Sequence, residues 1–168
     1  MRLAAILLVV LLVCGGCAGY RLGPTGGYAA GDRSIQVNPF HNQTLEPRLT
    51  DTVTQQLRKR LQQDGTFHLS THGRADISVS GVITRYERVA MSYASGDVAT
   101  GTDYRVGITA QVTAREVTTG KTIVDRPVTG YTIVRVGNDL TSSERQALPL
   151  LAQDLARNIT SLLADGSW

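Results

Sequence analysis

Alternating apolar and polar residues fill three long stretches in the middle of the chain, residues 75–89, 104–115 and 122–136. The apolar positions of the first stretch fall on one face: Ile77, Val79 and Ile83. A period of two predicts β-strands that bury one face and leave the other in contact with solvent. The sequence therefore predicts three strands, with one face of their sheet available for covering elements.

The two links between these strands differ in composition. Thr118-Thr119-Gly120-Lys121 is short and supplies a glycine, which predicts a tight hairpin turn. Residues 91–102 consist largely of Ser, Ala, Gly and Asp, which predicts a longer, mobile tip. Strands of about 14 residues would rise roughly 45 Å at about 3.3 Å per residue, so the expected shape is a tall, narrow meander.

Residues 46–64 carry a helical pattern. Four apolar residues recur at every fourth position and form one stripe: Leu49, Val53, Leu57 and Leu61. Pro47 is expected in the first turn, where a proline is tolerated, and Gly65 just past the last turn. The basic run Arg58-Lys59-Arg60 is expected in the last turns, where cations complement the helix dipole.

A second helix is predicted over residues 141–165. Thr141-Ser-Ser-Glu144 has the spacing of a capping box, with Thr141 as the N-cap. Helical spacing continues through Leu148, Leu155 and Leu162. Pro149 lies inside the run, so it either kinks the helix or starts its main body.

Two short strands complete the pattern, at residues 35–40 and 66–71. Pro39 indicates that the first strand ends there or runs along an edge. The order β-α-β-β-β-β-α, with two amphipathic helices for one apolar sheet face, predicts the α+β class. The expected architecture is a two-layer sandwich, in which a mixed, mainly antiparallel sheet has both helices packed on one face.

The N-terminus has the layout of a secretory signal. Met1-Arg2 precedes an apolar run over residues 3–13, which at about eleven residues is too short to span a bilayer. Gly15-Gly16-Cys17 then resembles a bacterial lipobox, whose cysteine is acylated, although Cys14 replaces the usual aliphatic residue. The alternative is an ordinary cleaved signal in which Cys17 is a stray thiol.

These features predict three segments. Residues 1–16 form the signal peptide, residues 17–33 an acylated anchor with a flexible Gly- and Pro-rich tether, and residues 34–168 one domain. With Cys17 acylated, the mature chain holds no thiol for disulfides or metal. No cofactor is expected beyond the covalent diacylglyceryl and N-acyl groups on Cys17.

Composition and motifs argue against several classes of function. The net charge is +3 and aromatic residues make up 5%, which does not favour nucleic-acid binding. The sequence has no nucleophile-elbow, zinc-protease or phosphate-loop motif, so we expect no enzyme. His68 and His72 are four apart, but on a strand and the turn after it their side chains need not converge, so no metal site is expected.

Six basic residues fall on the meander or its turns: Arg85, Arg88, Arg105, Arg115, Lys121 and Arg126. A solvated sheet face needs polar residues, and that explains them without a ligand. The alternative is that they bind the phosphates of an anionic lipid through charge-assisted hydrogen bonds.

Four segments resemble the LptE family of lipopolysaccharide-assembly lipoproteins. Cys17-Ala-Gly-Tyr-Arg-Leu-Gly resembles the acylated N-terminus of that family. Residues 35–47 resemble its first strand and the entry to its first helix, residues 73–81 the start of its second long strand, and residues 144–156 its last helix. The resemblance covers the mature chain in order.

This resemblance implies a non-enzymatic, lipid-anchored outer-membrane protein that faces the periplasm or lies within a barrel lumen. Its partners would be an LptD-type β-barrel, which it plugs and helps to assemble, and lipopolysaccharide, which it helps to deliver to the outer leaflet. Ala18 after the cysteine agrees with release to the outer membrane, because enteric bacteria use Asp there for retention. Arg85, Arg88 and Lys121 are the candidate lipopolysaccharide contacts that the resemblance implies.

A second hypothesis is a self-assembling outer-membrane lipoprotein of a secretion or envelope-scaffold system. It predicts homo-oligomers, whereas the LptE resemblance implies one copy per barrel. A third hypothesis, a periplasmic hydrolase, lacks a nucleophile with a base suggested by the sequence.

Overall fold

The computed structural model describes residues 31–136 and 139–165. The predicted signal peptide, Cys17 and most of the tether lie outside these residues. The elements follow in the order β1 (Ser34–Val37), β2 (His41–Asn42), α2 (Leu49–Asp64), β3 (His68–Leu69), β4 (Ile77–Ala94), β5 (Asp97–Glu116), β6 (Thr122–Arg135) and α3 (Leu140–Ala164). Within the described ranges, no helix combines the length and hydropathy that a bilayer span requires.

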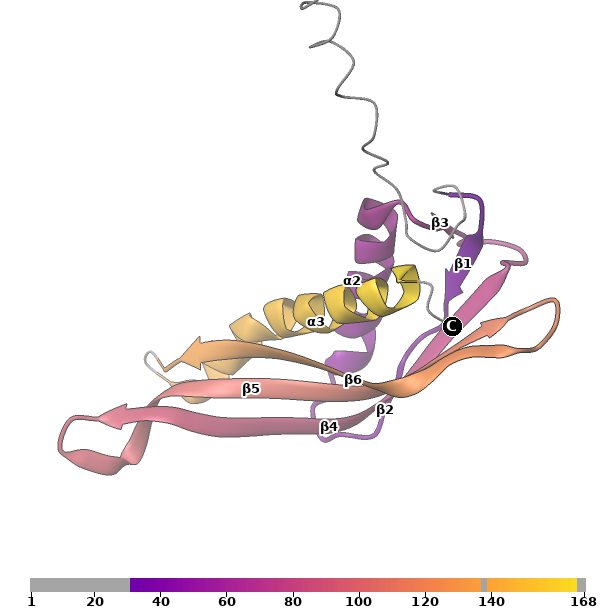
Figure 1. Cartoon of the computed structure of the whole chain (residues 1–168). Coiled ribbons are helices and arrows are strands. Elements are labelled where there is room, and N and C mark those ends of the chain that lie inside the picture. The colour runs from indigo at the N-terminus through magenta and orange to yellow at the C-terminus, as the bar shows by residue number, and fades with distance from the viewer. Residues whose placement is uncertain (1–30, 137–138, 166–168) are drawn as a thin grey trace, which may run out of the picture.

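One sheet holds all the strands, in the order β3-β1-β4-β5-β6, with the short β2 beside β4. β1 and β2 run parallel to β4, whereas β4, β5 and β6 form an antiparallel meander. Both helices lie on the same side of this sheet (Figure 1). The predicted two-layer α+β sandwich with a mixed, mainly antiparallel sheet is confirmed.

The link at residues 91–102 is not a loop, so that prediction was wrong. β4 continues to Ala94 and β5 begins at Asp97, so the connection is a tight turn containing Gly96 at φ 82°. β4 and β5 have 18 and 20 residues, more than the alternation predicted. Because β6 ends opposite Asp103, the outermost part of the β4–β5 hairpin is a two-stranded arm (Figure 1).

A bulge in β4 changes which side chains face the helices. Ile83 pairs with Ala110 and Arg85 pairs with Thr109, so Thr84 is an extra residue in the ladder. One inserted residue exchanges the two faces of the strand from that point on. Beyond the bulge, the even-numbered Arg88 therefore lies on the helix side, as the odd-numbered Ile83 does before it.

The core fills the space between the sheet and both helices. α2 contributes the predicted stripe of Leu49, Val53, Leu57 and Leu61, all at 0% exposure. The sheet contributes the alternating residues Ile77, Val79, Ile83, Val106, Ile108, Ala110, Val112 and Ala114. The predicted buried positions of these strands are confirmed.

Thr54 holds the chain between β1 and α2 in place. Its hydroxyl accepts a hydrogen bond from the buried Phe40 N–H at 3.1 Å and donates to the Thr50 carbonyl at 2.7 Å. Thr54→Val leaves the Phe40 N–H without a partner, and we expect a loss of about 1–3 kcal/mol in the free energy of unfolding. Urea denaturation measures it. Thr52→Val is the control, since the Thr52 hydroxyl donates to the exposed Arg48 carbonyl, and an equal loss there would contradict the prediction.

The first helix differs from its prediction at its start and in the role of its basic run. It begins at Leu49, so Pro47 precedes it instead of lying in its first turn. No basic residue lies in its last turn, so the expected dipole role of Arg58-Lys59-Arg60 was wrong. Arg58 instead donates to the Val37 carbonyl at the end of β1, at 2.7 Å. Gly65 ends the helix at φ 75°, as predicted.

The second helix has a different cap from the predicted one. Asp139 is the N-cap, and its carboxylate accepts from the Ser142 N–H at 2.8 Å. This bond lowers the pKa of Asp139. A carboxylate is a charge-assisted acceptor, which explains why it replaces the Thr141 hydroxyl. Pro149 lies inside the continuous helix, so the alternative that it starts the helix was wrong.

Candidate interaction surface on the open face of the sheet

The meander leaves the face opposite the helices uncovered by any described element (Figure 1). We call this surface the open face. The register places side chains of β4, β5 and β6 in rows across it, with Val89, Arg105 and Ile133 in one row and Glu87, Gly107 and Tyr131 in the next. A sheet face that only met water would carry polar residues at these positions.

Three large apolar side chains are exposed on the open face. Val89, Tyr131 and Ile133 have 55%, 56% and 59% of their surfaces exposed. Arg105 lies among them, with its guanidinium carbon 5.4 Å from the centroid of the Tyr131 ring. This cation–π contact holds a positive charge inside an apolar cluster.

Two further arginines flank this cluster. Arg85 is exposed, opposite Thr109. Arg135 forms an ion pair with Asp103 at 3.0 Å, and its side chain is 85% exposed. Asp103 has its pKa lowered by hydrogen bonds from Ser92 and Arg135, so it remains ionised. The open face thus offers apolar contact with guanidinium groups around it.

The three residues that the resemblance implied do not form one cluster. Arg85 lies on the open face. Arg88 lies on the helix side, because of the Thr84 bulge, and pairs with Glu144 at 2.7 Å. Lys121 lies in the β5–β6 turn, next to the end of β4 at Ile77. Ile77 is roughly 25 Å from Arg85 along β4, at about 3.3 Å per residue.

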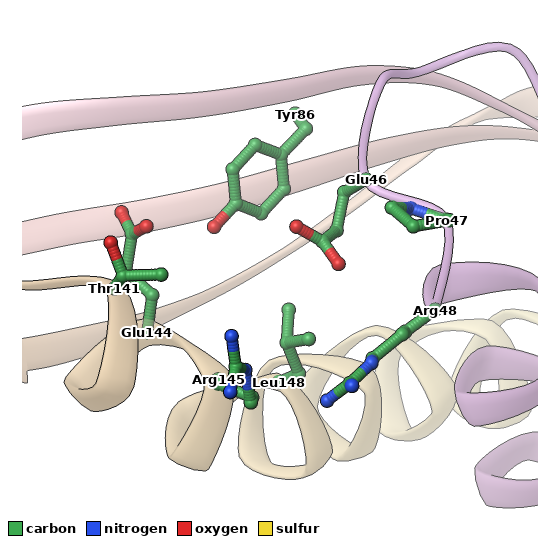
Figure 2. A pocket seen from close by; sticks show the side chains of 8 residues that line it. All are labelled: Glu46, Pro47, Arg48, Tyr86, Thr141, Glu144, Arg145 and Leu148. Carbon is green, nitrogen blue, oxygen red and sulfur yellow. The ribbon is translucent and has the colours of Figure 1, made fainter.

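A polar cleft of about 290 Å³ lies on the helix side, between the entry to α2 and the start of α3. Figure 2 shows the Tyr86 hydroxyl directed between the Glu46 and Glu144 side chains, with Arg48 and Arg145 across the cleft. The two carboxylates and two guanidiniums balance in charge. In the described ranges no three metal-binding side chains come together, at this cleft or elsewhere.

The environment of this cleft perturbs Tyr86. Burial, followed by the negative charges of Glu144 and Glu46, raises the pKa of Tyr86 from 10.0 to about 12. Tyr86 therefore stays protonated over the physiological range and can act there as a hydrogen-bond donor. The hydrogen bond to Glu144 raises the pKa of Arg88.

The shifted Tyr86 predicts a pH dependence of stability. Well below pH 10 the hydroxyl is protonated in both states, but between pH 10 and about 12 the unfolded chain has largely lost the proton that the folded protein retains. Stability therefore falls as the pH rises through this window, and Tyr86→Phe should reduce the fall. Urea midpoints at about pH 9 and about pH 11 measure it. Equal falls in the two proteins would contradict the prediction.

The apolar residues of the open face were not predicted from the sequence. Tyr131 and Ile133 alternate with the inward positions Thr132 and Val134, so β6 is apolar on both faces at that point. This out-of-phase pair was a usable signal. Val89 could not be assigned without knowing that Thr84 forms a bulge.

The fold and the open face define a class of protein, namely a two-layer α+β domain with a long antiparallel meander whose outer face is uncovered. The family model described as LptE, lipopolysaccharide-assembly, matches residues 33–163. The chain belongs to the LptE family, which is a family of lipoproteins of lipopolysaccharide assembly. A search among curated proteins finds no match.

Solved structures confirm the fold. A protein from Xanthomonas campestris is similar at a TM-score of 0.62 and 11% identity, covering 86% of this chain and 90% of its own. A hypothetical protein from Chlamydia trachomatis gives a TM-score of 0.58 at 12% identity, with coverages of 81% and 96%. A minor lipoprotein from Acinetobacter baumannii gives 0.51 at 18% identity, with coverages of 79% and 92%. At these identities the likeness concerns the fold alone.

Proposed function

We propose that this protein is an outer-membrane lipoprotein that associates with an LptD-type β-barrel and helps it to deliver lipopolysaccharide to the outer leaflet. The observation that carries the proposal is the open face, where Val89, Tyr131 and Ile133 surround Arg105. Exposed apolar clusters with a polar rim mark interaction surfaces. Membership of the LptE family supports a partner in the lipopolysaccharide-transport machinery.

Acylation of Cys17 would hold the domain at the membrane. Stable anchoring needs more than one acyl chain, and a lipoprotein N-terminus with diacylglyceryl and N-acyl groups meets that need. Residues 18–30 would then connect the anchor to the domain. Gly31 and Arg33 already belong to the domain, since Gly31 N–H donates to Thr66 and Arg33 pairs with Glu116 at 2.8 Å.

Arginines of the open face are the candidates for contact with lipid phosphate. A guanidinium binds phosphate through two parallel hydrogen bonds. Arg85 and Arg105 are exposed on this face, so a phosphate can reach their guanidinium groups. Arg88 is a weaker candidate than the sequence implied, because Glu144 already accepts its hydrogen bond. Lys121 would contact lipid only at the far end of the meander.

Depletion of the protein from growing cells tests the proposal. We expect the amount of folded barrel in the outer membrane to fall, together with the lipopolysaccharide that reaches the cell surface. Expression of the wild-type chain from a plasmid should restore both. Normal levels of folded barrel and of surface lipopolysaccharide after depletion would refute the proposal.

A further inference from the structure

The two outer edges of the meander differ, and part of the β6 edge is blocked by α3. The Tyr131 N–H donates to the Asp154 carboxylate at 3.0 Å, and the Thr129 carbonyl accepts from the Asn158 side-chain amide at 2.8 Å. Both partners belong to α3. Pro127 on the same strand has no N–H to offer. Three backbone groups of this edge, at residues 127, 129 and 131, are therefore occupied or missing, which disfavours the addition of a further strand there.

The β4 side is open over part of its length. β2 pairs with β4 only at Val82 and Ile83, and the last bond there joins the Gln43 N–H to the Ile83 carbonyl at 2.9 Å. Beyond Ile83, no strand in the described ranges pairs with this side of β4. Residues 85–90 keep a regular register with β5 between two bulges. A run of six residues matches the usual length of about five to six for a strand.

The hydrogen bonds on β6 reveal which β4 groups point outward. Thr129 and Tyr131 direct their backbone groups to α3, away from β5. Their partners on β5 are Thr109 and Gly107, which therefore direct their own backbone N–H and C=O groups to β4.

Thr109 and Gly107 pair in turn with Arg85 and Glu87. The backbone groups of Arg85 and Glu87 are thus used within the sheet, and those of the residues between and after them point outward. Tyr86, Arg88 and Ala90 therefore present their N–H and C=O groups at the open edge.

A hollow lies at the start of this edge, where the line of β2 ends. It has a volume of about 430 Å³ and is lined by residues 43–46 and 84–86. Leu45 is at this hollow and its side chain is fully exposed, at 103%. A strand that continued the line of β2 would fill the hollow and cover Leu45.

We propose that an extended segment of the barrel partner adds to β4 as a strand along residues 85–90. This inference rests on the proposed function. Main-chain hydrogen bonds to Tyr86, Arg88 and Ala90 would give affinity, and side chains at alternate positions would give specificity. The neighbours of the segment on the open face are Arg85, Glu87 and Val89. The segment therefore carries an acidic residue beside Arg85, a basic residue beside Glu87 and an apolar residue beside Val89. An apolar residue of the segment covers Leu45.

Ala90→Pro tests the proposal, because it removes an outward N–H, as Pro127 does on β6. Ala90→Val keeps the N–H and is the matched control. Both are made in the full-length chain at native expression, with the photo-crosslinker benzoylphenylalanine at Leu45. We expect the wild type and Ala90→Val to crosslink to the barrel, and Ala90→Pro to lower the yield about tenfold. If Ala90→Pro fails to fold, Glu87→Lys, which keeps the backbone and reverses one complementary charge, should lower the yield instead.

Three results would overturn the proposal. A crosslinked product of twice the mass of the chain would mean that a second copy occupies the edge. Co-purification of the barrel without a crosslink at Leu45 would reject the added strand and leave the proposed function intact. Absence of the barrel from every preparation would reject both.

Discussion

Gly130→Ala is expected to destabilise the domain strongly, because the added methyl group would meet the backbone of α3. A Cβ at Gly130 would lie 2.5 Å from the backbone nitrogen of Leu155 and 2.7 Å from its Cα. These are backbone atoms of α3, so a side-chain rotation cannot relieve the contact. The helix must move away from β6, and α3 and β6 are packed along much of their length.

We expect Gly130→Ala to lower the free energy of unfolding by about 3 kcal/mol, at the upper end of the cost of overpacking. The corresponding fall in melting temperature is about 10 °C for a domain of this size. Gly107→Ala is the matched control on β5, since its Cβ would only touch the Glu87 Cγ at 3.4 Å. A melting temperature of Gly130→Ala equal to that of Gly107→Ala would show that α3 does not pack as described.

Ile133→Glu is expected to abolish association with the barrel while leaving the fold intact. Ile133 is 59% exposed, so a carboxylate there stays hydrated in the free protein. In a complex formed through the open face, the same carboxylate would be buried without a partner. An uncompensated buried charge costs about 3–5 kcal/mol, so the recovered barrel should fall by at least about tenfold.

Leu150→Glu is the control for this variant. Leu150 is 58% exposed, but it lies on α3, away from the open face. Both variants add one negative charge at a similar exposure. We expect affinity purification from detergent-solubilised outer membranes to recover normal amounts of barrel with Leu150→Glu. Equal recovery with both variants would show that the open face does not bind the barrel.

Much of the fold could be predicted because burial repeats with the period of each element. The stripe of Leu49, Val53, Leu57 and Leu61 and the alternation of β4 and β5 each identify one apolar face, and the structure buries those residues. The α+β class follows from the order of these elements. Pattern alone could not place the start of α3, because Asp139 and Thr141 are both good N-caps and only the structure shows that the Asp139 carboxylate accepts from the Ser142 N–H.

The candidate surface could be predicted only in part. Arg85 and Arg105 were identified as basic residues of the meander, and both are exposed on the open face. Arg88 was grouped with them, but one bulged residue, Thr84, moves it to the other side of the sheet. A bulge leaves no periodic signal in a strand that already mixes polar and apolar residues. The contact of Arg88 with Glu144 spans 56 residues, and such pairs are not visible in a single sequence.

The central claim is that this protein forms a one-to-one complex with an LptD-type barrel. Its most direct test is purification of the tagged chain from outer membranes at native expression, followed by identification and quantification of the proteins that co-purify. The account predicts one such barrel per copy of the chain. A homo-oligomer without a barrel would contradict it, and would favour the self-assembling lipoprotein instead.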